Sequence, residues 1–457
     1  MKINFIKLLY EEENNMKNNK GITLVALVVT IVVLLILAGV SINLVLGDNG
    51  IITKAKEAQR KSAEASQNDL IGMNELAQQL EEQINGSTGS GSGNGGAGGS
   101  GTDTKVPAEA TAETAPYFPD NTFTKKEGTI DTGLVIQDAS GNEYVWVVVP
   151  RTTAVYKTTG LGKTTFTDAD YTSIEKDLKE YTKTYRNGTE HSDTWYADNK
   201  TEGWLSEAEY KKLKNSMLKS VYENGGFYVG RYEAGIAENR TGNTDKNSDG
   251  KYTIEGMPTP VTKADAYPYT YVTRTQAQNL ASKVNAGTKT SSLMFGVQWD
   301  LVLAFMSKDT AKITSTDVLT TDSTTIGNYY NSTFQLSQTG KYATMSKWSL
   351  SSTWNPTTTS TTDFVDSSRN KIAQSSQGNG ILVTTGTSEK NKVMNIYDVA
   401  GNVWEWTLEK TSYDGNPCAR RGGSCGDYGS DGPAADCNYI YTTTLADCHV
   451  GFRLSLW

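Results

Sequence analysis

Histidine and cysteine are scarce in this sequence. Its 457 residues include two histidines, His191 and His449, and four cysteines, all of which lie within the last forty residues. Two histidines are too few to favour a metal centre or a nucleophilic site built on histidine. The cysteine spacings match no zinc knuckle. Four cysteines in an exported chain allow three disulfide pairings, so paired and free thiols both stay open.

A second absence lies at the same end of the chain. Between Cys418 and Leu456 there is no Lys, Glu, Gln, Met or Trp, although these five types make up 88 of the first 417 residues. At that frequency, a window of this length should hold about eight of them. The clusters of Cys, Asp, Tyr, Asn, Ile and His in the segment can all be derived from an asparagine codon by changing its adenines. The five missing types cannot, so the composition indicates a segment rewritten at adenines.

Positive charge is also limited. The net charge is −8 and the pI is near 5.1, and no basic stretch outside the N-terminus could hold nucleic acid, which needs clustered Lys and Arg. Residues 245–250 match the first half of a calcium loop, but the twelfth position is Gly256 and Glu255 comes one place early. We interpret this stretch as a solvated turn, and we expect no metal and no cofactor.

One long uncharged segment follows the first twenty residues. From Gly21 to Gly47 there is no charged side chain, and the apolar run from 22 to 46 has about 25 residues, or roughly 38 Å of helix, enough to cross a bilayer. Lys17 and Lys20 precede it, so the positive-inside rule places the N-terminus in the cytoplasm and the rest of the chain outside. The sequence therefore predicts a single-pass protein of the cell membrane.

The start of this segment resembles a type IV prepilin, with a short charged leader (1–21) before a long apolar helix. By that resemblance, a prepilin peptidase would cut after Gly21, and Ile22 would become the first mature residue. The fifth mature position, usually Glu in that family, is Ala26 here, which affects the expected contacts with other pilus subunits. A plain membrane anchor is the alternative interpretation. An amphipathic stripe of apolar residues extends the predicted helix to residue 84.

A spacer and a large body follow the helix. Residues 85–115 are expected to form a flexible Gly/Ser-rich linker, because 85–105 hold nine glycines and no large apolar side chain. In the body, 116–457, a hairpin is expected from 134–136 and 144–150. A short strand is expected at 227–233.

Helices alternate with these strands. Ser206-Glu207-Ala208-Glu209 forms a capping box that predicts a helix after it, and Thr275-Gln276-Ala277-Gln278 is a second candidate. A further helix is expected over 296–306. Trp404 and Trp406 alternate as in a strand and are expected to pack in the core. The pattern is that of a mixed α+β domain.

Three segments of the body together resemble the formylglycine-generating-enzyme (sulfatase-modifying-factor) branch of the C-type lectin fold. They are 227–233, 296–300 and 395–407, the last of which contains Gly-Asn-Val-Trp-Glu-Trp. Arg-Gly-Gly-Ser at 421–424 and Gly-Phe-Arg at 451–453 complete the frame. The resemblance implies a C-type lectin-like domain.

The chemistry of those enzymes is not expected here. They oxidise a substrate cysteine with two cysteines placed a few residues after the Gly-Gly-Ser. In this chain Cys425 follows Ser424 directly, and the next cysteine, Cys437, comes twelve residues later. A shared fold does not imply a shared function, so we expect the chain not to be an enzyme, and a cysteine oxidase is our third hypothesis.

The same frame also resembles the variable proteins of diversity-generating retroelements, in which a reverse transcriptase rewrites adenines in a C-terminal repeat, here 418–457. The resemblance implies a surface-displayed protein that binds an unknown macromolecular or cell-surface ligand; a structural pilin or pseudopilin subunit is the alternative. Tyr, Asp, Asn and His suit an adaptable binding surface. The predicted contact residues are Cys425, Asp427, Tyr428, Asp431, Asp436, Cys437, Asn438, Tyr439, Ile440, Tyr441, Asp447, Cys448 and His449.

Overall fold

The structure is a computed structural model. It describes residues 106, 109–186, 191–333, 340–346, 349–350, 353–356 and 380–457. The predicted leader with its Gly21–Ile22 junction, the apolar segment 22–46, the helix to residue 84 and the spacer up to residue 105 lie outside the described residues. Among the described helices, none is both long enough and apolar enough to cross a membrane.

A six-stranded antiparallel sheet forms the centre of the described chain. Its strands, in spatial order, are β1 (Thr124–Glu127), β2 (Val135–Gln137), β3 (Glu143–Val148), β4 (Gly226–Gly230), β18 (Leu454–Leu456) and β7 (Ser291–Leu293). The predicted hairpin is confirmed, because β2 pairs with β3 in register Val135↔Val145. All six residues of β3 are buried, as expected for a strand covered on both faces. The strand predicted at 227–233 ends earlier, at Gly230.

Five α-helices are described beside the sheets: α3 (Asp168–Tyr181), α4 (Glu207–Asn224), α5 (Arg274–Ala281), α6 (Gly296–Met306) and α7 (Asp317–Thr320). The capping box that predicts α4 is confirmed: Ser206 Oγ accepts from the Glu209 backbone, and the Glu209 carboxylate accepts from the Ser206 backbone. The helix ends at Gly225, whose φ of 71° suits glycine. The predicted α6 has the expected bounds, and all its residues are buried.

The capping box proposed for α5 was placed two residues too late. The hydroxyl that accepts from the helix belongs to Thr273, and the reciprocal side chain is Gln276. Gln276 is thus the N3 residue of the box rather than a residue inside it. The helix also ends at Ala281, before Val284. Both Thr-x-x-Gln strings satisfy the pattern, and tertiary packing selected the earlier one.

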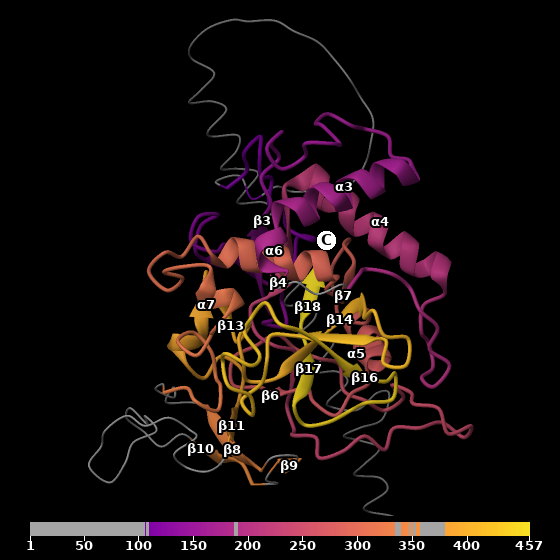
Figure 1. Cartoon of the computed structure of the whole chain (residues 1–457), viewed down its shortest axis with the longest axis vertical. Helices are drawn as coiled ribbons and strands as arrows, with labels where there is room; N and C mark the ends of the chain where they lie inside the picture. Colours follow the sequence, from indigo (N-terminus) through magenta and orange to yellow (C-terminus); the bar gives the residue numbers. More distant parts are fainter. Residues whose placement is uncertain are drawn as a thin grey trace, which may run out of the picture. The chain divides into compact units, whose positions relative to one another are not determined.

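A second sheet, of four strands, holds the C-terminal segment (Figure 1). Its spatial order is β16 (Cys437–Tyr441), β15 (Cys418–Arg421), β14 (Trp404–Lys410) and β17 (Val450–Phe452). The β14–β17 pair is parallel, in register Trp404↔Val450, and the other pairs are antiparallel. Trp404 and Trp406 are both buried, as predicted. From β17 the chain passes through Arg453 directly into β18, so residues 450–456 join the two sheets.

The remaining strands are short. They are β5 (Gly235–Ile236) with β6 (Tyr267–Pro268), β12 (Lys392–Val393) with β13 (Ile396–Tyr397), and a sheet of β10 (Asn355–Pro356), β8 (Lys341–Ser346) and β11 (Gly380–Val383), with β9 (Ser349–Leu350) on β8. Two 3₁₀ turns, η1 (Lys183–Tyr185) and η3 (Glu389–Asn391), complete the described elements.

The end of the predicted spacer lies against the body. Thr114 and Ala115 are buried, and the Ala115 backbone N–H donates to the Asn224 carbonyl at 2.7 Å. The Val106 N–H donates to the Pro116 carbonyl at 3.1 Å, and the Val106 side chain belongs to the core. Residues 109–115 therefore form ordered contacts at the C-terminal end of α4.

Candidate ligand-binding face

Three consecutive segments near the C-terminus carry the thirteen predicted contact residues. The loop 422–436 carries five of them, strand β16 carries five, and the loop 442–449 carries three. All three segments border β14 or β15. We call the side chains that they present the tip face.

A network of four charges, three of them buried, lies next to this face. The Arg421 guanidinium binds the carboxylates of Asp300, through Nη2, and of Glu409, through Nε at 3.1 Å. Arg186 bridges the same two carboxylates from the other side, at 2.7 Å to Asp300 and 3.3 Å to Glu409. The third donor of Arg421, Nη1, reaches the Ala435 carbonyl at 2.7 Å. The network therefore ties β14, β15 and α6 to the end of the loop 422–436.

The pKa of Glu409 reflects this pairing. Burial alone would raise it, but the guanidinium groups of Arg421 and Arg186 lower the pKa of Glu409 to about 2. Its charge is therefore kept at neutral pH. Removing one member of such a buried group leaves an uncompensated charge, which costs far more than an exposed ion pair contributes.

A second buried pair fixes the junction between the two sheets. Arg453 donates from Nη2 to Glu405 at 2.6 Å and from Nε to both carboxylate oxygens at 3.1 Å. It also donates to the carbonyls of Gly230 and Tyr397 at 3.0 and 2.9 Å. All three nitrogens of the guanidinium thus donate hydrogen bonds, which explains why an arginine sits between β17 and β18.

The Arg-Gly-Gly-Ser stretch turns the chain from β15 into the loop. Gly422 and Gly423 have φ of 92° and 77°, which side chains adopt at a cost. A Cβ on Gly423 would lie 2.1 Å from the Gly432 carbonyl oxygen. The backbone at Gly423 therefore lies against the backbone at Gly432 within the loop 422–436, and a glycine is required at position 423.

The predicted contact residues divide by burial. Eight have partly or fully exposed side chains: Asp427, Tyr428, Asp431, Asp436, Asn438, Tyr441, Asp447 and His449. Three are buried, namely Cys425, Cys437 and Cys448, each at most 3% exposed. Tyr439 and Ile440 lie on β16, and their side chains are outside the description. The exposed members are the ones that can meet a ligand in this conformation.

Several of these exposed residues lie around the side chain of Arg420. Its guanidinium lies 4.2 Å from the Trp404 ring centre and 4.0 Å from the Tyr441 ring centre. Burial lowers the pKa of Arg420, and the nearby Tyr441 hydroxyl and the carboxylates of Asp427, Asp447 and Asp436 oppose that shift. Residues from all three segments therefore surround one cation. Its Nε has no hydrogen-bond partner among the described residues.

Asp427 holds the loop 422–436 onto the sheet. Its Oδ2 accepts from the Trp404 Nε1 at 2.8 Å, from the Ser424 backbone at 2.9 Å and from the Ser424 hydroxyl at 2.6 Å. A predicted contact residue is thus also a structural anchor. Beyond it, Tyr428 is 45% exposed and packs edge-on against Tyr330, with ring centres 5.5 Å apart.

The second loop meets the first through His449. A Cβ on Gly426 would lie 3.3 Å from the His449 Nε2, so the two loops touch there. The His449 backbone N–H donates to Asp447 Oδ1 at 2.8 Å. Burial lowers the pKa of His449, and Asp447 opposes the shift.

All four cysteines are free thiols in buried positions. Cys425 and Cys448 share an apolar cluster with Met345, Leu382 and Val403. Burial raises the pKa of the Cys425 and Cys437 thiols well above the usual range. The thiolate is the reactive form of cysteine, so burial disfavours the reactive form of Cys425 and Cys437.

Arg420 and Tyr330 were not among the predicted site residues. Arg420 could have been found from the two-residue period of a strand. Arg421 belongs to the Arg-Gly-Gly-Ser frame, so the side chain of its neighbour must point to the opposite face. No pattern in the sequence indicates that Tyr330, nearly a hundred residues away, packs on Tyr428.

The stretch 245–250 forms a turn. Asn247 Oδ1 accepts from the backbones of Asp249 and Lys251, both at 3.0 Å, and Arg240 pairs with Asp245 at 2.5 Å. In the described ranges, no three His, Cys, Asp or Glu side chains are grouped as metal ligands would be.

Searches with family models and among curated proteins find no match. Similar solved structures include Treponema denticola variable protein 1, at 12% identity, covering 50% of this chain and 84% of that one, with a TM-score of 0.24. Another is CarF, at 16% identity, covering 58% of this chain and 96% of that one, with a TM-score of 0.25. The described body is a mixed α+β domain with a distant likeness to these structures.

Proposed function

We propose that this chain is a ligand-binding protein, anchored in the cell membrane by residues 22–46, whose tip face is diversified by a retroelement. Its body would be a C-type lectin-like domain displayed outside the cell. Recognition of a macromolecular ligand, without catalysis, would be its activity. The spacer before the body would let the tip face reach that ligand.

One observation carries the proposal. Eight positions with the adenine-derived composition present side chains on the loops 422–436 and 442–449 and on β16, above the buried Arg421 and Arg453 pairs. A backbone held by such buried charge pairs can accept changes at exposed side chains, because surface substitutions rarely change stability by more than about 0.5 kcal/mol. Tyrosines and small polar residues suit such a surface, since they give contact area and hydrogen bonds at low entropic cost.

The buried thiols also favour binding over cysteine oxidation. An oxidase of this kind would need a reactive thiolate near the Gly-Gly-Ser turn. Burial disfavours ionisation at both Cys425 and Cys437, and no thiol of the described chain is exposed.

Sequencing this gene from many closely related cells tests the proposal. We expect substitutions to concentrate at the thirteen predicted positions, with Arg421, Gly422, Gly423 and Arg453 unchanged. A reverse-transcriptase gene and an adenine-rich template copy should lie nearby. Substitutions scattered evenly over the surface of the body would overturn the proposal and support a structural pilin subunit instead.

A further inference from the structure

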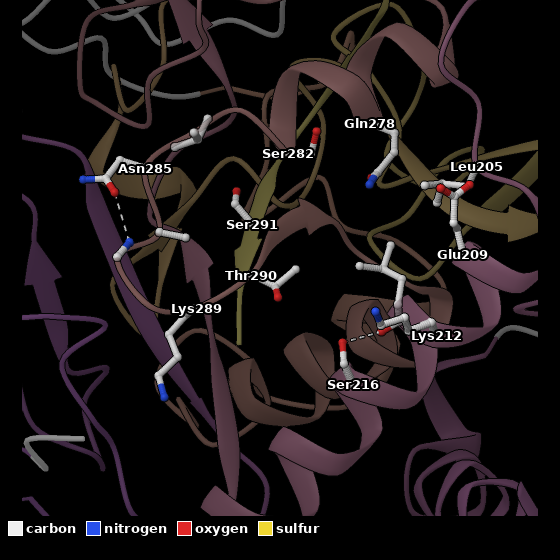
Figure 2. A pocket seen from close by; sticks show the side chains of 14 residues that line it. Leu205, Glu209, Lys212, Ser216, Gln278, Ser282, Asn285, Lys289, Thr290 and Ser291 are labelled. Carbon is white, nitrogen blue, oxygen red and sulfur yellow. Dashed lines mark hydrogen bonds between the residues drawn. The ribbon is translucent and has the colours of Figure 1, made fainter. Parts of the chain in front are cut away.

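A pocket of about 580 Å³ lies between α4, α5 and β7 (Figure 2). Its lining includes the Glu209 carboxylate and the Lys212 ammonium group beside amides and hydroxyls. Because groups of both charges share this lining, its chemistry favours no particular ligand. The tip face, in contrast, continues onto a neighbouring segment that has a definite chemical character.

Residues 322–331 lie against the tip-face loop that contains Asp427 and Gly429, and we call them the flanking segment. The Tyr330 backbone N–H donates to the Asp427 carbonyl at 2.8 Å, and the Ser323 backbone N–H donates to the Gly429 carbonyl at 3.1 Å. Hydrogen bonds between backbone groups do not depend on the side chain at position 427. The flanking segment therefore stays beside the tip face when side chains of the loop are rewritten.

The flanking segment presents an aromatic ring and a carboxylate next to the tip face. Tyr330 is half-buried and packs edge-on against Tyr428, which is 45% exposed, with ring centres 5.5 Å apart. Asp322 is exposed, and a Cβ on Gly429 would lie 2.8 Å from its Oδ1. A ligand that covers Tyr428 would therefore also meet the flanking segment.

The chemistry of this segment suits a protein ligand. Tyrosine is enriched among the residues that contribute most to protein–protein binding, and a lysine or arginine is attracted to the face of an aromatic ring. The exposed carboxylate of Asp322 adds negative charge near such a cation. A sugar would need one flat platform for stacking, which the edge-on rings of Tyr330 and Tyr428 do not provide.

We infer that the flanking segment is a constant part of the binding face and that Tyr330 contacts a basic side chain of a protein ligand. The inference rests on the proposed function, under which only the repeat 418–457 is rewritten. Tyr330 and Asp322 would then accompany every version of the tip face. The diversified side chains would select the protein that is bound, and the flanking segment would contribute the same contacts each time.

Selection from a library of full-length chains displayed on bacterial cells tests the inference. The library varies six of the eight exposed tip-face positions and keeps Asp427 and Tyr428. It is selected against lysozyme, a basic protein, and separately against dextran, a neutral polysaccharide. Titration with the labelled probe then gives the affinity of each selected chain.

We expect several independent lysozyme binders that share a dependence on the flanking segment. Tyr330→Ala should weaken each of them about tenfold, as expected for an aromatic residue at the centre of an interface, and Tyr330→Phe should retain most of the affinity because the ring remains. Asp322→Asn should weaken them about two- to fivefold, and more at low salt than at high salt. This variant keeps the acceptor for the Thr324 backbone N–H, so it gives a second test if Tyr330→Ala lowers stability.

Two exposed residues outside the tip face and the flanking segment provide matched controls. Tyr413→Ala and Asp249→Asn should leave lysozyme binding unchanged. Lysozyme binders that tolerate both Tyr330→Ala and Asp322→Asn would overturn the inference and leave the proposed function intact. Dependence on Tyr330 among dextran binders alone would overturn it as well. A library that yields no binder to either probe would overturn the proposed function and the inference together.

Discussion

Replacing Asp427 by alanine should destabilise the body although Asp427 belongs to the predicted contact set. The substitution removes three hydrogen bonds to one carboxylate oxygen and leaves Trp404 Nε1, on a side chain only 2% exposed, without an acceptor. Hydrogen bonds to charged groups contribute about 1.5–3 kcal/mol each, and an unpaired buried donor costs about 1–3 kcal/mol. Because these terms are not additive, we expect a loss of about 2–4 kcal/mol in the free energy of unfolding.

Asp431→Ala is the matched control for this prediction. It removes the same charge from the same loop, but Asp431 is exposed, so its cost should stay within about 0.5 kcal/mol. Urea unfolding of the full-length chain, followed by tryptophan fluorescence, measures both. Asp427→Asn keeps an acceptor for Trp404 and should recover part of the loss. Equal destabilisation by Asp427→Ala and Asp431→Ala would refute the view that Asp427 anchors the loop.

Three further outcomes can be measured. Arg421→Met should cost about 3–5 kcal/mol in the free energy of unfolding, measured in the same assay. The substitution leaves two buried carboxylates with Arg186 as their remaining guanidinium partner. A cost below that of Asp427→Ala would contradict a structural role for the charge network. NMR titration of the two histidines should give pKa values below 6.5 for both, because burial disfavours the imidazolium form at His191 and His449; a midpoint above 6.5 at either would be inconsistent. Deleting residues 22–46 should move the protein from the membrane fraction to the soluble fraction, and continued sedimentation with membranes would rule out this segment as the anchor.

Asp427 is both a predicted contact residue and an anchor of the loop, and this limits the residues expected at position 427. If the loop needs an acceptor at this position, variants recovered from related cells should favour Asp, Asn or Ser at 427. At Tyr428 and Asp431, whose side chains are exposed, a wider range of residues should occur. A position can therefore be rewritten by the same chemistry as its neighbours and still be restricted by the fold.

Local signals in the sequence were enough for several elements. The capping box at Ser206 and the apolar stretch 296–306 predicted α4 and α6, because helix termini and buried helices depend mainly on neighbouring residues. The alternation around 134–150 predicted the first hairpin for the same reason. The α5 box was misplaced because two overlapping Thr-x-x-Gln strings were equally good locally, and only the packing of Thr273 and Gln276 distinguished them.

The composition of residues 418–456 by itself determined where variation is expected, since codon derivation depends on residue type and order alone. It could not decide which of those residues face solvent. Burial of the three cysteines, the anchoring bonds of Asp427 and the position of Arg420 between Trp404 and Tyr441 arise from contacts between segments that are distant in the chain. Such contacts form only when β14, β15 and β16 are brought side by side, so the tertiary structure alone decided which predicted positions can meet a ligand.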